Sequence, residues 1–145
     1  MRYDAALMYT CSLIEFICRR NRLRRGEVVR ELGRDAVMRI YRHADVLHSE
    51  AIEGVADEYI RMSDMAEGDY DNVGTCRYDV PDYWTMGEVC ERLIEDVTTG
   101  DVLATLHEVY DSWMCDALSN YNSDLFYQPR DYLRECYLAG EILAA

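Results

Sequence analysis

Nine arginines lie within 24 residues of the N-terminal half, and they form the densest group of side chains able to bind a charged ligand. The nine are Arg19, Arg20, Arg22, Arg24, Arg25, Arg30, Arg34, Arg39 and Arg42. A guanidinium group binds two oxygens of a phosphate or a carboxylate at once. Three kinds of contact are open: acidic residues of this chain or solvent, the acidic face of another protein, and nucleic acid. The net charge of -13 favours the first, because affinity for phosphates depends on uncompensated positive charge.

A second candidate contact surface is the polar and aromatic stretch from residue 120 to residue 127. Its candidate partner-binding residues are Asn120, Tyr121, Asn122, Asp124 and Tyr127, which join those of the first arginine run, Arg19, Arg20, Arg22, Arg24 and Arg25. Tyrosine with asparagine and serine is a composition suited to adaptable protein contacts. The alternative, which the sequence favours slightly, is a structural turn whose amide and carboxylate side chains bind the backbone while its aromatic rings pack.

The residue types used in catalysis do not form a recognisable set. The three histidines lack metal-binding spacing, and the six cysteines contain no C-x-x-C pair. Five of these cysteines stand in apolar helical stripes, where burial raises the pKa of a thiol and makes it a poor nucleophile. Neither a G-x-S-x-G elbow nor a glycine-rich phosphate loop occurs in the sequence. We therefore predict that the protein is not an enzyme and has no catalytic residue, no metal site and no cofactor.

The charge is distributed unevenly along the chain. Residues 1–62 hold eleven arginines and ten carboxylates, whereas residues 63–145 hold four arginines and eighteen carboxylates. An acidic half repels nucleic acid and anionic membranes and attracts basic partners. No apolar run reaches the roughly 18 residues that a membrane span needs. The N-terminus lacks the pattern of a signal peptide, so we expect a cytoplasmic protein.

Apolar residues recur at helical spacing along most of the chain, and no strand pattern of useful length appears. The predicted fold is all-α, a compact bundle of about seven helices over residues 5–20, 26–32, 36–44, 50–63, 85–97, 102–118 and 129–139. Asp4 is expected as the N-cap of the first helix and Asp101 or Thr99 as that of the sixth, Thr85 with Glu88 as a capping box, and Gly33 and Gly140 as helix stops. An acidic linker over 64–83 joins an N-terminal half, 1–63, to a C-terminal half, 84–145, and we expect one globular unit.

Each half also resembles a family of short, uncharacterised bacterial helical proteins. In the first half the resemblance is carried by Gly26-Glu27-Val28, by residues 41–48 and by Tyr59-Ile60; in the second, by Met86-Gly87-Glu88-Val89, Arg92-Leu93-Ile94, residues 110–113 and residues 119–124. The resemblance implies a fusion of two neighbouring gene products. Such genes often lie beside one for an ADP-ribosyltransferase-like protein, which implies a toxin–antitoxin or immunity module. It provides no catalytic residues.

These observations predict a non-catalytic protein-binding module, antitoxin-like or immunity-like, whose partner is an ADP-ribosyltransferase-like neighbour. The alternative is a small DNA-binding transcriptional regulator that uses the arginine-rich region 19–42, because two short helices around a glycine resemble a helix-turn-helix. The acidic second half makes nucleic acid the less favoured partner.

Overall fold

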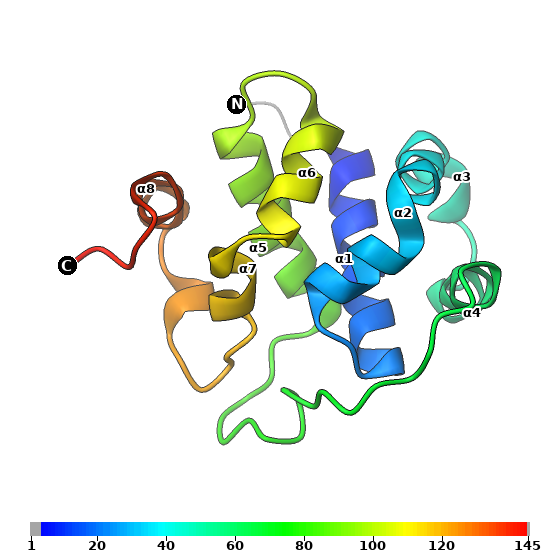
Figure 1. Ribbon diagram of the computed structural model, residues 1–145, viewed down its shortest axis with the longest axis horizontal. Coiled ribbons are helices and arrows are strands. Elements are labelled where there is room, and N and C mark those ends of the chain that lie inside the picture. Colours follow the sequence, from blue (N-terminus) through cyan, green and yellow to red (C-terminus); the bar gives the residue numbers. More distant parts are fainter. Residues whose placement is uncertain (1–3, 145) are drawn as a thin grey trace.

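Helices account for all the regular structure in residues 4–144, the part of the chain that the computed structural model describes. The elements are α1 (Ala5–Asn21), α2 (Arg25–Arg42), α3 (Ala44–Leu47), α4 (Ile52–Met62), α5 (Tyr83–Val97), α6 (Val102–Tyr110), α7 (Trp113–Leu118), the 3-10 turn η1 (Leu125–Tyr127) and α8 (Arg130–Ala139). No strand occurs in this range, so the prediction of an all-α bundle is confirmed (Figure 1).

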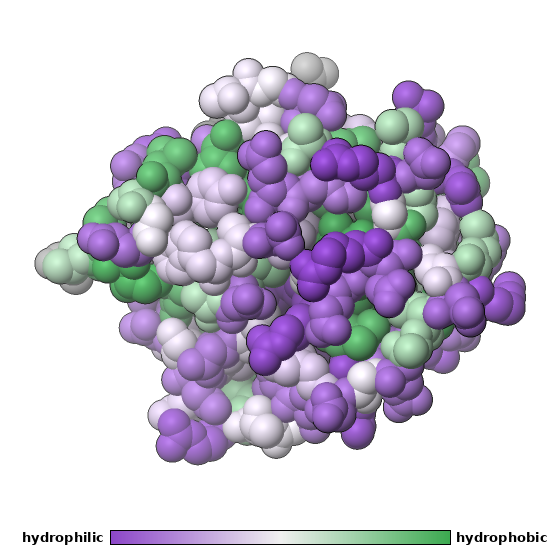
Figure 2. Space-filling model, viewed as in Figure 1, coloured by the Kyte–Doolittle hydropathy of each residue, from purple (hydrophilic) through white to green (hydrophobic). Residues whose placement is uncertain are grey.

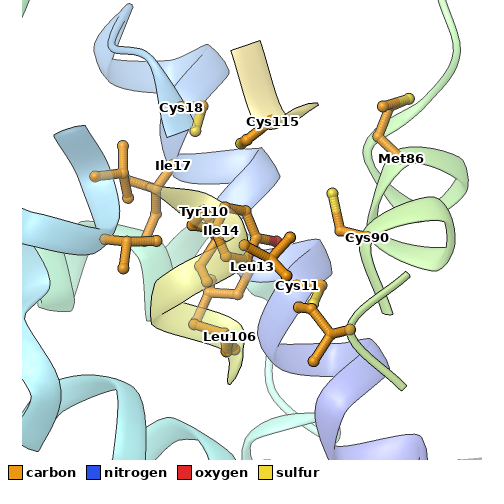
Figure 3. Packing of buried hydrophobic residues seen from close by; sticks show 14 of the residues in the cluster. Cys11, Leu13, Ile14, Ile17, Cys18, Met86, Cys90, Leu106, Tyr110 and Cys115 are labelled. Carbon is orange, nitrogen blue, oxygen red and sulfur yellow. The ribbon is translucent and has the colours of Figure 1, made fainter. Parts of the chain in front are cut away.

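Helix α1 lies at the centre of the bundle, with α5 and α2 packed against it (Figure 1). Its most extensive contact is with α5, from the other half of the chain, and its next is with α2. Residues 7, 13, 14 and 17 of α1 are completely buried. Burial of each such aliphatic side chain stabilises the folded state by about 1.5–3 kcal/mol. The buried cluster draws on both halves and includes Cys11, Leu13, Ile14, Ile17, Cys18, Met86, Cys90, Leu106, Tyr110 and Cys115 (Figure 3).

Three predicted helix ends are confirmed. Asp4 caps α1, since its Oδ1 accepts a hydrogen bond from the backbone N–H of Leu7 at 3.0 Å. Asp101 caps α6 in the same way through the N–H of Ala104 at 3.2 Å. Gly140 ends α8 with a φ of 78°, in the left-handed region that glycine adopts without steric cost.

The predicted start of the fifth helix is wrong. Helix α5 begins at Tyr83 and not at Thr85, because Asp82 is the N-cap: its Oδ1 accepts a hydrogen bond from the N–H of Thr85 at 2.7 Å. An aspartate there satisfies an N–H group that would otherwise lack a partner. The Thr85–Glu88 pair therefore lies inside the first turns of the helix.

The predicted break between the stretches 26–32 and 36–44 is confirmed, because Gly33 has non-helical angles (φ 81°, ψ 166°) and divides α2 into two helical parts that meet at a kink. The second part ends at Arg42, two residues before the predicted end, and Ala44 begins α3. The prediction for the sixth helix needs correction. The stretch 102–118 is divided into α6 and α7. At the division, the Ser112 hydroxyl donates to the carbonyl of Val109 at 2.6 Å, a side-chain bond that competes with the helical ladder.

The acidic linker ends at Asp82, one residue earlier than predicted, and it is held against the end of α1. The N–H of Gly68 donates to the carbonyl of Asn21 at 2.8 Å, and the N–H of Tyr70 donates to that of Arg22 at 3.0 Å. The Asn21 side chain in turn donates to the carbonyls of Met65 and Ala66, both at 3.2 Å. These bonds fix the path of the linker across the bundle.

The close contact of α1 with α5 requires a glycine, so we predict that Gly87→Ala destabilises the protein. A Cβ at residue 87 would meet the hydroxyl of Ser12 and lie 2.8 Å from the Cα of Ser12. Overpacking of this kind costs about 1–3 kcal/mol, more than alanine gains in helix propensity. Urea denaturation of the two proteins measures the difference in the free energy of unfolding.

Gly54→Ala is the matched control, because a Cβ at residue 54 of α4 meets nothing within 4 Å. We expect this variant to be more stable by about 0.5–1 kcal/mol. Equal effects of the two substitutions would contradict the packing of α1 against α5 described above.

Candidate functional site

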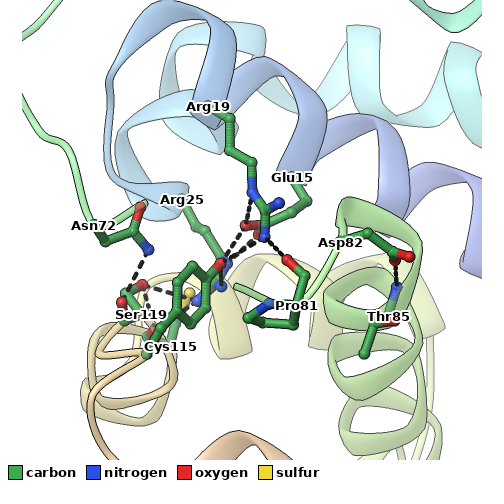
Figure 4. A network of polar contacts seen from close by, with 10 residues as sticks. Glu15, Arg19, Arg25, Asn72, Pro81, Asp82, Thr85, Cys115 and Ser119 are labelled. Carbon is green, nitrogen blue, oxygen red and sulfur yellow. Dashed lines mark hydrogen bonds and ion pairs between the residues drawn. The ribbon is translucent and has the colours of Figure 1, made fainter. Parts of the chain in front are cut away.

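Arg25 of the arginine run lies in the core and pairs with Glu15 of α1. Both side chains are only 3% exposed. The Arg25 Nε donates to Glu15 Oε1, while its Nη1 donates to the carbonyl of Cys115 at 3.1 Å and to the hydroxyl of Ser119 at 2.8 Å. The pair therefore joins α1 and α2 to the end of α7 (Figure 4).

Tyr121 and Arg19 complete this buried network. The Tyr121 hydroxyl donates to Glu15 Oε2 at 2.6 Å and accepts hydrogen bonds from Arg19 at 3.0 Å and Arg25 at 3.1 Å. Arg19 also pairs with Glu15 at 3.2 Å and donates to the carbonyl of Pro81 at 2.7 Å, just before α5. Every charged member thus has an opposite charge and further hydrogen bonds.

The network keeps both charges of the ion pair in place. Burial by itself raises the pKa of the Glu15 carboxyl, but Arg25, Arg19 and the Tyr121 hydroxyl together hold it below its ordinary value. Burial likewise opposes the charge of Arg25, yet Glu15 raises the pKa of the guanidinium well above its usual range. The pair is ionised, so removing either partner leaves an uncompensated charge in the core.

Three further arginines pair with carboxylates at the surface: Arg20 with Asp57 at 3.0 Å, Arg24 with Asp116 at 3.9 Å and Arg30 with Asp111 at 2.8 Å. Each such exposed ion pair contributes at most about 1 kcal/mol to the free energy of unfolding. With Arg19 and Arg25, five of the nine arginines pair with acidic residues of this chain, so for these five the first of the three expected contacts is confirmed. Among the candidate partner-binding arginines, Arg19 is half-buried and Arg20, Arg22 and Arg24 are exposed.

The stretch 120–127 is divided between internal and surface residues. Tyr121 is buried, and Asn122 binds the linker through both ends of its amide: its Oδ1 accepts from the N–H of Arg77 at 2.7 Å and its Nδ2 donates to the carbonyl of Thr75 at 3.1 Å. The structural-turn alternative describes these two residues. The other three candidates, Asn120, Asp124 and Tyr127, are exposed.

The linker and the loop 120–127 together enclose an open hollow of about 760 Å³, which we call the acidic hollow. Its walls include Tyr78, Asp79, Asn122, Asp124, Phe126 and Tyr127, and no arginine lines it. The tyrosines at residues 78 and 127 are 65% and 67% exposed. The two aspartates form no ion pair within residues 4–144. The guanidinium of Arg77 already lies over the Tyr78 ring, 5.9 Å from its centroid. The hollow therefore offers the ring of Tyr127 and unpaired negative charge to an incoming cation.

The buried cysteine thiols of the core are poorly suited to act as nucleophiles. Burial raises the pKa of Cys11, Cys18, Cys90 and Cys115, which keeps these thiols protonated. The position of these cysteines in apolar stripes is confirmed, because all except Cys76 are buried. Over the described residues, no group of three or more histidine, cysteine or acidic side chains has the geometry to hold a metal ion.

Some residues of interest were not expected from the sequence. Tyr78 and Asp79 lie in the linker, where the composition indicated only a connector. No local pattern in the sequence signals that the linker meets the loop at Asn122. The buried Tyr9 ring packs against those of His48 and Trp84, with centroids 5.8 and 6.5 Å away. This aromatic group joins three elements distant in sequence.

Comparison with family models, with curated proteins and with solved structures finds no match. Within the part of the chain that is described, no helix is long and apolar enough to cross a membrane.

Glu91 of α5 is a second carboxylate in the core, and it has no ion pair among the described residues. Its side chain is 2% exposed, and its Oε2 has no hydrogen-bond partner there. Burial raises its pKa from 4.5 to about 7, with a further increase from the charge of Glu95 that Arg130 opposes in part. Arg130 itself binds Asp96 at 2.7 Å, so its charge is largely compensated.

We predict that Arg25→Met strongly destabilises the protein, by about 3–5 kcal/mol, because it leaves the Glu15 carboxylate buried and unpaired. Adding Glu15→Leu removes that charge, so the double variant should be more stable than Arg25→Met alone. Chemical denaturation of the wild type, both single variants and the double variant gives the coupling energy. Additive losses would contradict a buried ion pair.

We predict that Glu91→Gln stabilises the protein in a pH-dependent way. A raised carboxyl pKa favours folding fully below pH 4.5, and this contribution is lost as the pH rises through about 7. The neutral glutamine avoids that loss, so the variant should gain at most about 3 kcal/mol over the wild type at pH 8 and little at pH 4. Thermal denaturation across this range measures the effect, with Glu53→Gln on the exposed face of α4 as the control. A pH-independent difference would contradict the titration of Glu91.

Proposed function

We propose that this chain is a non-catalytic protein-binding module and that the acidic hollow is its contact surface. The observation that carries the proposal is the exposure of Tyr78 and Tyr127 beside two aspartates without ion pairs in residues 4–144. Tyrosine is enriched among the residues that dominate binding energy at protein interfaces. Its large ring provides contact area at a small cost in side-chain entropy.

The hollow has a rigid base, which supports a role in recognition. The ring of Tyr121 contacts Phe126 with centroids 5.7 Å apart, and Phe126 contacts Tyr127 at 4.8 Å, both edge to face. Tyr121 is in turn fixed by its bonds to Glu15 and Arg25. A pre-organised surface loses less conformational entropy on binding.

The protonated thiols of the core support the non-catalytic part of the proposal, because a thiol with a raised pKa is a poor nucleophile. The resemblance of both halves to proteins encoded beside ADP-ribosyltransferase-like genes supports an antitoxin-like or immunity-like role. In that role the protein would act in the cytoplasm, against the neighbouring gene product.

The alternative of a DNA-binding regulator draws less support from the geometry. Five of the nine arginines in 19–42 pair with carboxylates of the chain itself, which reduces the positive charge available to phosphates. A gel shift with the DNA upstream of its own gene, over a salt series, tests this alternative, and binding at low salt that weakens steeply with salt would favour it.

We expect the immobilised protein to retain the product of the neighbouring gene and Tyr127→Ser to reduce this retention at least about fivefold, as for loss of an aromatic anchor. Val46→Ser on α3 is the control: residue 46 is 60% exposed, comparable to residue 127, and α3 lies on the other side of the bundle (Figure 1). No retention above background, or equal retention by all three proteins, would contradict the proposed function and its surface.

A further inference from the structure

An apolar groove lies next to the acidic hollow, and the two share the residues Ser123 and Asp124 in their walls. The groove has a volume of about 530 Å³. Its apolar wall residues are Ala117, Leu125, Pro129 and Ile142, together with the ring of Tyr132. Residues 123 and 124 therefore form a ridge with an acidic, aromatic hollow on one side and an apolar groove on the other.

The apolar character continues onto the surface beside the groove. Leu138 of α8 is 64% exposed and Ile142 is 51% exposed. Figure 2 shows apolar residues gathered over α8 and the C-terminal segment. Large exposed apolar side chains in a cluster mark sites where another molecule is bound.

We propose that this double surface recognises one segment of a basic, amphipathic protein partner. An arginine or lysine of the segment enters the acidic hollow between Asp79 and Asp124, and a neighbouring bulky apolar residue enters the groove against Leu125 and Ile142. The inference rests on the proposed function and specifies the chemistry of the partner.

The charges around the ridge select this partner. Asp79 and Asp124 have no ion pair in the described range, whereas the arginines of α8 are compensated: Arg134 binds Glu135 at 2.9 Å and Arg130 binds Asp96 at 2.7 Å. Cations over aromatic rings and beside carboxylates are attracted by both. The exposed ring of Tyr127 provides the first kind of contact, since the guanidinium of Arg77 already lies over the ring of Tyr78, 5.9 Å from its centroid. The aspartates provide the second.

The same charges disfavour two other occupants. A second copy of the chain that used this face would bring aspartates against aspartates, in a protein whose net charge is already -13. A membrane surface with anionic lipids would be repelled in the same way. A basic segment is attracted at long range and then held by its apolar anchor.

Three synthetic peptides of equal length test the inference: one with leucine and arginine, one with leucine and glutamate, and one with serine and arginine. Fluorescence anisotropy measures their affinity for the full chain at low and moderate salt. We expect the leucine–arginine peptide to bind about tenfold more tightly than either of the others, because only it satisfies both halves of the surface. Equal binding of the glutamate peptide would overturn the acidic half, and equal binding of the serine peptide would overturn the apolar half.

Paired variants locate the binding. Asp79→Asn with Asp124→Asn should weaken binding of the leucine–arginine peptide about three- to tenfold and reduce its salt dependence. Glu53→Gln with Glu58→Gln on α4 removes the same charge and should change the affinity less than about twofold.

A second pair of variants tests the apolar groove. Ile142→Ser should weaken binding of the leucine–arginine peptide but not of the serine–arginine peptide. Met62→Ser, at a residue of similar exposure, should affect the binding of neither peptide. Equal effects of variants and controls would overturn the assignment to this face.

Failure of this inference can be separated from failure of the proposed function. If retention of a protein partner depends on Tyr127 but none of the peptides distinguishes the variants, the surface binds a partner of different chemistry and the inference alone is overturned. If neither the partner nor any peptide is bound, both are overturned.

Discussion

A buried charge must be paired, and this requirement determines how the interior of the protein is connected. Glu15 lies in the most buried helix, where an isolated carboxylate would be prohibitively costly. Arg25 neutralises it and uses its remaining donors on the end of α7, and Tyr121 brings the following loop to the same place. One ion pair therefore fixes three segments that are up to 106 residues apart in the sequence. An apolar pair could fill the same volume, but it would not select these partners by hydrogen-bond geometry.

The position of the candidate binding surface follows from this network. Because the Tyr121 hydroxyl points to Glu15, its ring forms the base on which Phe126 packs. Asn122 then fixes the linker through the backbone at Thr75 and Arg77, which brings the next residues of the linker to the edge of the loop. The acidic hollow is thus a consequence of the internal bonds of Tyr121 and Asn122, and the exposed side chains of its walls are those of Tyr78, Asp79, Asp124 and Tyr127.

The two core carboxylates are held in opposite ways. Glu15 has two arginines and a hydroxyl around it, and its pKa is lowered. Glu91 faces Glu95 without a direct ion pair, and its pKa is raised to about 7. The surroundings of Glu15 favour its charged form and those of Glu91 favour its neutral form. Of the two core carboxylates, one is therefore ionised beside Arg25 and the other changes its charge with pH near neutrality.

The amino-acid sequence by itself determined the helical class, most helix positions and the burial of five of the six cysteines, because apolar periodicity and local capping residues act over a few positions. It missed the start of α5, where Asp82 and Thr85 compete to cap the helix, and it missed the division of the apolar stripe 102–118 at Ser112. Both outcomes depend on which of several possible local hydrogen bonds forms. Only the tertiary structure decided which arginines are internal. Arg24 and Arg25 are neighbours with the same side-chain chemistry, yet Arg25, the first residue of α2, is buried, whereas Arg24, its extended N-cap, is exposed. The joining of Tyr78 and Asp79 to the loop at 122–127 was likewise decided by long-range packing, which no local pattern encodes.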